Sequence, residues 1–323
     1  MKTKKITVPA VSICLLLVLS AACAFSPLTQ GNVSSNSLMT PNESNGLVVY
    51  TSFYTMKDFA SKIGGERIQL NSIMPIGADP HDWEPTPAQI SNLEYADIFI
   101  FNGAGIEHWV DKVLGALRNQ SLIVVETTAG IDLLDGSCCP GGELSILHEH
   151  TTDPHVWLNP MKAKLQMQAI RDAFVQADSQ NSDYFNENFK RYAAKLDELD
   201  KEFHEALYGL TNRTIVVSHE AFGYLCDAYN LIQIGISGPE ANTEPSPARM
   251  AQIIELINEH EISVVFFEEL ASSRVVEAVA RETGTRTAVL SSIEGLTDAQ
   301  ISVGDDYFTI MRQNLQALKE ALS

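Results

Sequence analysis

Residues 186–207 read NENFKRYAAKLDELDKEFHEAL, without a glycine or a proline. The apolar side chains in this stretch recur at helical spacing: Phe189, Tyr192, Ala193, Leu196, Leu199 and Phe203. The pattern predicts one long, charged helix. Short apolar runs alternate with helical patterns on both sides of it, which indicates an α/β protein with mainly parallel sheets. We therefore expect two α/β lobes joined by one long, rigid α-helix.

Seven short apolar runs are candidates for the strands of these sheets. Before the long helix they are residues 47–53, 68–74, 97–101 and 122–125, and after it 214–217, 263–267 and 287–290. We accordingly place the first lobe at residues 47–182, the linking helix at 183–209 and the second lobe at 210–323.

Three helix starts are explicit in the sequence. Thr86-Pro87, Asn159-Pro160 and Ser246-Pro247 each place a good N-cap residue before a proline in the first turn. Helical periodicity follows the last of them at residues 250–258 and returns at 274–282.

The amino terminus resembles an export signal. Lys2, Lys4 and Lys5 precede an apolar run at residues 10–22 that is too short to span a bilayer. We assign residues 1–22 to a signal peptide and the polar residues 23–46 to a flexible tether. Leu19-Ser20-Ala21-Ala22-Cys23 resembles a bacterial lipobox, and Ala22-Cys23-Ala24 also fits an ordinary cleavage site. We expect an extracytoplasmic protein, either lipid-anchored through Cys23 to the outer face of the cytoplasmic membrane or periplasmic.

Charge and cysteine content exclude two classes of protein. A formal net charge of −19 argues against nucleic acid as a partner. The five cysteines do not form a disulfide framework, because one lies in the signal and Cys23 at its cleavage site. Cys138 and Cys139 adjoin a Pro-Gly-Gly turn, where a vicinal bridge, a soft metal contact and two free thiols all remain open.

Four residues at predicted loop positions carry metal-ligand chemistry. His81 follows the 68–74 strand, His219 follows 214–217, Glu268 follows 263–267, and His155 lies in an Asp-Pro-His-Val-Trp loop. Ligands of open α/β sheets bind outside the carboxyl ends of strands. Three imidazoles and one oxygen form an ordinary tetrahedral Zn²⁺ set, whereas Ca²⁺ and Mg²⁺ prefer oxygen ligands. The sequence therefore predicts a zinc site.

The surrounding phrases resemble a known family. They are His81-Asp82-Trp83-Glu84-Pro85-Thr86-Pro87, Asp153-Pro154-His155-Val156-Trp157-Leu158-Asn159-Pro160, Ser218-His219-Glu220-Ala221-Phe222-Gly223-Tyr224 and Ile293-Glu294-Gly295-Leu296-Thr297. The chain is similar along nearly its whole mature length to the zinc and manganese solute-binding proteins of ABC importers, the ZnuA and TroA type.

The resemblance implies two Rossmann-like lobes with the metal in the cleft between them. His81 and His155 match ligands from the first lobe, and His219 and Glu268 match ligands from the second. A histidine at position 219 points to the zinc subgroup. The implied function is a zinc receptor, expected to be a monomer, that delivers Zn²⁺ to the membrane permease of an ABC importer.

Several alternatives stay open at this point. Glu269 or a water could replace Glu268, and His148 and His150 either gather zinc or form a plain polar loop. The rival functions are a manganese or iron receptor, a zinc hydrolase, and a surface adhesin stabilised by metal. His219-Glu220 continues without the second histidine of an H-E-x-x-H helix, which argues against the hydrolase.

Overall fold

The structure is a computed structural model that describes residues 46–135, 152–238 and 244–323. The predicted signal, the tether up to residue 45 and Cys23 lie outside the described residues, as do Cys138, Cys139, His148 and His150. Among the helices of the described ranges, none has the length and apolar character needed to cross a membrane.

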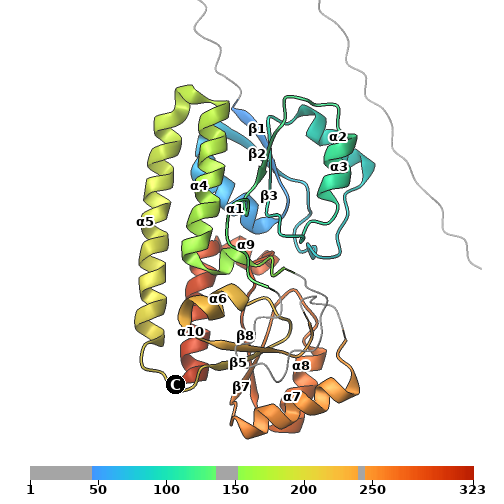
Figure 1. Ribbon diagram of the computed structural model, residues 1–323, viewed down its shortest axis with the longest axis vertical. Helices are drawn as coiled ribbons and strands as arrows, with labels where there is room; N and C mark the ends of the chain where they lie inside the picture. The colour runs from blue at the N-terminus through green and yellow to red at the C-terminus, as the bar shows by residue number, and fades with distance from the viewer. Residues whose placement is uncertain (1–45, 136–151, 239–243) are drawn as a thin grey trace, which may run out of the picture. The chain divides into compact units, whose positions relative to one another are not determined.

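Four parallel strands form the first sheet, in the order β2-β1-β3-β4. Figure 1 labels β1, β2 and β3 of this sheet. β1 (Leu47–Thr51) pairs with β2 (Ile68–Ser72) and β3 (Ile98–Phe101), and β3 also pairs with β4 (Ile123–Glu126). All four residues of β3 are buried, as expected of a parallel strand covered on both faces. The four strand predictions of this half are confirmed.

The second sheet repeats this order as β6-β5-β7-β8, again parallel. It consists of β5 (Thr214–Val217), β6 (Ile232–Gly235), β7 (Val264–Phe267) and β8 (Arg286–Val289). The sequence analysis missed β6, because its four residues, Ile-Gln-Ile-Gly, combine only two apolar side chains with a glycine. We call the part that carries β1–β4 the first lobe and the part that carries β5–β8 the second lobe.

The three predicted helix starts are confirmed. The side chains of Thr86, Asn159 and Ser246 each accept a hydrogen bond from a backbone N–H of the first turn, and each is followed by proline. The helices are α1 (Tyr54–Gly64), α2 (Pro87–Asn92), α3 (Val110–Ala116), α4 (Pro160–Ala177), α5 (Ser182–Leu207), α6 (Gly223–Tyr229), α7 (Pro247–Glu259), α8 (Arg274–Thr283), α9 (Asp298–Val303) and α10 (Tyr307–Leu322).

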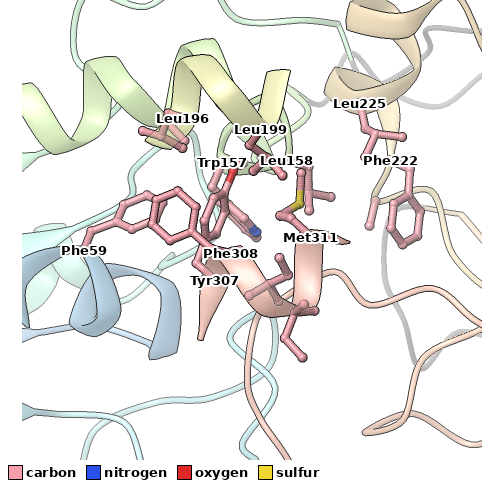
Figure 2. Packing of buried hydrophobic residues seen from close by; sticks show 14 of the residues in the cluster. Phe59, Trp157, Leu158, Leu196, Leu199, Phe222, Leu225, Tyr307, Phe308 and Met311 are labelled. Carbon is pink, nitrogen blue, oxygen red and sulfur yellow. Dashed lines mark hydrogen bonds between the residues drawn. The ribbon is translucent and has the colours of Figure 1, made fainter. Parts of the chain in front are cut away.

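The long helix is α5, which has 26 residues and begins slightly before the predicted stretch. It packs against α4 and α10, and in Figure 1 α4 lies beside its upper part and α10 beside its lower part. Figure 2 shows Leu196 and Leu199 of α5 in one apolar cluster with Trp157, Tyr307 and Met311. Trp157 lies between β4 of the first lobe and α4, whereas Tyr307 and Met311 lie on α10, which follows β8 of the second lobe. The cluster therefore joins segments from both lobes.

The predicted fold class, two parallel sheets and one long helix, is confirmed. The described residues from 46 onward form one compact unit, so the contacts between them define no boundary at residues 182 or 209. The division at residues 182 and 209 stays a prediction.

Candidate metal centre

His81 lies in the loop between β2 and α2. Its backbone N–H donates to Asp79 Oδ1 at 2.9 Å, a local turn that sets the direction of the chain just before the capped helix. The side chain is 11% exposed. Its Nε2 is buried and has no hydrogen-bond partner among the described residues.

His155 is fully buried and directly precedes a 3₁₀ turn, η3 (Val156–Leu158). Asp153 Oδ1 accepts the backbone N–H of His155 at 2.9 Å and lies 2.8 Å from the ring Nδ1. Asn102, at the end of β3, donates through Nδ2 to the Pro154 carbonyl at 3.0 Å. These contacts hold Nδ1 of the ring against Asp153, so that Nε2 points into the site.

His219 follows β5 and is also fully buried. Its Nδ1 lies 2.5 Å from Glu268 Oε1, and the Ser218 hydroxyl donates to the same oxygen at 3.2 Å. β5 and β7 are neighbours in the sheet, so the residues that follow them meet at its carboxyl edge. The Nε2 of His219 is buried without a hydrogen-bond partner in the described part of the chain.

Glu294 completes the group. Its Oε1 lies 3.1 Å from His155 Nε2, 3.5 Å from His81 Nε2 and 3.9 Å from His219 Nε2. One ligand atom from each of the four residues falls within 4.8 Å of the others. Tetrahedral Zn²⁺ with bonds of about 2.0–2.1 Å separates neighbouring ligand atoms by roughly 3.3 Å. Small side-chain shifts would therefore suit the four atoms to one zinc ion.

The structure thus brings together His81, His155 and His219 but pairs them with Glu294 and not with Glu268. Glu268 stands behind His219, on its Nδ1 side, and Glu269 Oε1 accepts a hydrogen bond from Gln300 Nε2 at 2.9 Å. The sequence analysis missed Glu294, although this residue follows the predicted strand at 287–290. The rule that ligands bind outside the carboxyl ends of strands, which selected Glu268, applies to Glu294 as well.

The charges of the site stabilise each other. Burial opposes a charge on His155, but hydrogen bonds and charges from Asp153 and Glu294 outweigh it and raise its pKa to about 10. Burial also opposes a charge on His219, whose pKa the Glu268 carboxylate raises. Burial would raise the pKa of Glu294, but the hydrogen bond from His155 and the nearby rings of His155 and His81 hold it well below its ordinary value. A divalent cation that enters the group must therefore displace a proton.

A pocket that Glu294 helps to line lies between the two lobes. It is lined by residues 77–79 of the first lobe and by 268–271 and 291–295 of the second. Four of these lining residues are acidic: Asp79, Glu268, Glu269 and Glu294. The rim of the site therefore attracts cations.

The comparison with known proteins agrees with this chemistry. The model of the ZnuA family, described as "Zinc-uptake complex component A periplasmic", matches residues 49–321. The chain belongs to the ZnuA family. Members of this family are solute-binding components of uptake systems and not enzymes.

Two relatives and one solved structure show how far the similarity to the family extends. The high-affinity zinc uptake system protein ZnuA of Bacillus subtilis is 37% identical over 315 residues, which cover 97% of this chain and 96% of that protein. The zinc-binding lipoprotein AdcA of Streptococcus pneumoniae is 30% identical over 325 residues, but this chain spans only 61% of its length. The crystal structure of the Zn(II)-bound ZnuA-like domain of S. pneumoniae AdcA has a TM-score of 0.74 and 32% identity, covering 86% of this chain and 99% of that domain.

Proposed function

We propose that this ZnuA-family chain is the extracytoplasmic zinc receptor of an ABC importer and that His81, His155, His219 and Glu294 hold the ion. The observation that carries the proposal is the convergence of three imidazole Nε2 atoms on Glu294 Oε1 at 3.1–3.9 Å. Zinc is the cargo of this site, bound and then released, and serves no catalytic step.

The ligand set favours zinc over harder cations. Imidazole suits borderline ions such as Zn²⁺, whereas Mn²⁺ prefers carboxylate and carbonyl oxygens. Only one of the four proposed ligands, Glu294, is an oxygen donor. The names of the similar proteins from B. subtilis and S. pneumoniae, both of which mention zinc, support the same choice.

Glu294 replaces Glu268 as the proposed fourth ligand because of where each carboxylate lies. Glu294 Oε1 faces the Nε2 atoms of all three histidines, while of these three rings Glu268 Oε1 contacts only that of His219, at Nδ1. A carboxylate on the far ring nitrogen fixes the tautomer and orientation of a zinc-bound histidine. Glu268 is thus proposed to orient His219.

The route of delivery is proposed from the family and from the amino terminus. The family consists of uptake components, so the partner that receives the zinc is the membrane permease of the importer. The basic and apolar residues before Cys23, and the lipoprotein name of the S. pneumoniae relative, support a lipid anchor at Cys23.

Metal analysis tests the proposed function. Protein purified without added metal is expected to contain one equivalent of zinc, and metal-free protein is expected to bind Zn²⁺ more tightly than Mn²⁺ in a competition titration with a chromophoric chelator. Tighter binding of Mn²⁺, or a zinc affinity that survives replacement of all three histidines by alanine, would exclude the proposal.

A further inference from the structure

The segment Ser291–Glu294 carries the proposed fourth ligand from the end of β8 into the site. Its first residue is held by α10 of the same lobe: Ser291 N–H donates to Asn314 Oδ1 at 2.9 Å, and Asn314 Nδ2 donates to the Ser291 carbonyl at 2.8 Å. The carbonyls of the next two residues are held differently, by side chains of the first lobe.

Two buried side chains of the first lobe donate to this segment. The indole Nε1–H of Trp157 donates to the Ser292 carbonyl at 2.7 Å, and the Thr55 hydroxyl donates to the Ile293 carbonyl. Both donors are inaccessible to solvent. The hydrogen bonds therefore fix the two peptide groups directly before Glu294, in a place where water cannot replace either donor.

The backbone of Ile293 is in an unfavourable conformation. Its φ is 61°, in the left-handed region that β-branched residues rarely adopt. Such conformations persist only where the surrounding structure enforces them. The hydrogen bonds from Thr55 and Trp157 on either side of this backbone are contacts that can enforce it, and the bend they maintain immediately precedes Glu294.

Trp157 is itself rigidly placed. The Tyr307 hydroxyl donates to the Trp157 carbonyl at 2.7 Å, and the indole packs against Phe53 at 5.1 Å and His155 at 5.4 Å between ring centroids. Figure 2 shows Trp157 inside the apolar cluster with Tyr307. The same short turn, η3, therefore follows the ligand His155 and holds the segment that carries Glu294.

We propose that Thr55 and Trp157 are positioning residues that hold the Glu294 carboxylate in place before zinc arrives. The proposal rests on the proposed function, in which Glu294 is a ligand. Neither residue touches the ion. Their hydrogen bonds keep the segment bent, so that binding does not have to supply the ordering of the fourth ligand. Without them the Ile293 backbone relaxes and the carboxylate moves away from the three imidazoles.

The decisive comparison uses three threonine variants. Thr55→Val keeps the shape of the side chain and removes the donor, whereas Thr55→Ser keeps the hydroxyl. Thr51→Val is the matched control, because Thr51 is equally buried and its hydroxyl donates to the Asn71 carbonyl within the first sheet. We expect Thr55→Val to weaken zinc binding by about three- to tenfold, the loss of one buried hydrogen bond. Thr55→Ser and Thr51→Val should bind like the wild type.

The visible absorption spectrum of bound Co²⁺, which responds to the ligands of the ion, separates positioning from a general effect on folding. The Thr55→Val spectrum should shift toward that of Glu294→Ala, and the spectra of the other two threonine variants should not. Trp157→Phe removes the second donor, and its Co²⁺ spectrum should shift in the same direction. This variant tests the proposal if Thr55→Val does not fold.

Three results would count against the proposal. Thr55→Val and Trp157→Phe with wild-type zinc affinity and Co²⁺ spectra would overturn the positioning role and leave the receptor function intact, provided that Glu294→Ala changes both. If Thr51→Val lost as much zinc affinity as Thr55→Val, the loss in Thr55→Val would reflect general destabilisation of the fold and not the positioning of Glu294. Wild-type behaviour of Glu294→Ala would overturn the ligand assignment and the positioning role with it.

Discussion

His219 Nδ1 lies 2.5 Å from Glu268 Oε1, on the opposite side of the ring from Nε2, which lies 3.9 Å from Glu294 Oε1. Each ring nitrogen of His219 thus faces a different carboxylate. A zinc ion bound through Nε2 would keep Glu294 as a fellow ligand and Glu268 as the hydrogen-bond acceptor of the ring.

This arrangement predicts different roles for the two glutamates. Glu268→Ala is expected to lower zinc affinity by roughly 10- to 100-fold, the usual effect of losing the hydrogen-bond partner of a ligating histidine. Its Co²⁺ spectrum should keep the wild-type form, and Glu268→Gln should restore most of the affinity because its amide oxygen still accepts from Nδ1. If Glu268→Ala changes the spectrum as Glu294→Ala does, Glu268 is a ligand after all.

The third histidine is expected to control the choice between zinc and manganese. His219→Ala should weaken zinc binding more than Glu268→Ala, because it removes a ligand directly. His219→Glu should narrow the difference between the zinc and manganese dissociation constants, since a carboxylate oxygen suits the harder ion. Competition titrations with both metals on the three proteins provide the measurement. A zinc affinity unaffected by His219→Ala would refute the site.

The pKa shifts predict opposite pH dependences for the metal-free protein and for zinc binding. The pKa of His155, raised to about 10, stabilises the metal-free fold fully below the ordinary value of about 6.5, and this stability is lost as pH rises toward 10. The lowered pKa of Glu294 contributes stability that is present above about 4.5 and lost at lower pH. The group should therefore stabilise the metal-free protein most between about pH 4.5 and 6.5.

Zinc affinity should change the other way, because the ion displaces the proton that His155 holds. The apparent affinity is expected to rise about tenfold per pH unit for each proton released as pH increases from about 6.5 toward 9. Thermal unfolding of metal-free protein and zinc titrations in the same buffers measure both effects. An apparent affinity that does not depend on pH over this range would contradict the prediction.

Removal of the metal should leave the chain folded. The two sheets and the helices around α5 bury an extensive apolar core that does not involve the ion. Chelated protein should keep its far-ultraviolet circular dichroism and rebind zinc, and zinc at a thousand times its dissociation constant should add about 4 kcal/mol to the free energy of unfolding. Loss of the fold on chelation would instead indicate a structural metal, as in a metal-stabilised adhesin.

The predicted anchor is tested on the mature amino terminus. Mass spectrometry of protein recovered from membranes should find Cys23 as the first residue, carrying lipid. A mature chain that begins at or after Ala24, or an unmodified Cys23, would exclude the anchor without affecting the proposed export.

Local sequence was sufficient for much of the fold. The caps at Thr86, Asn159 and Ser246, the helix α5 and seven of the eight strands follow from patterns of neighbouring residues. β6 did not, because a four-residue strand with one glutamine and one glycine is defined by its pairing with β5 and not by its own pattern.

The sequence by itself also selected the three histidines as candidate ligands, since each lies in a distinctive phrase, but only the tertiary structure placed Glu294, and not Glu268, beside their Nε2 atoms. Both glutamates follow strands of the same sheet. Glu268 comes directly after β7 and contacts Nδ1 of His219, which follows the neighbouring strand β5. Glu294 reaches the Nε2 atoms through a bend at Ile293, where the carbonyls of Ser292 and Ile293 accept hydrogen bonds from Trp157 and Thr55 of the other lobe. Contacts between residues so far apart in the chain depend on how the lobes pack, which no local pattern encodes.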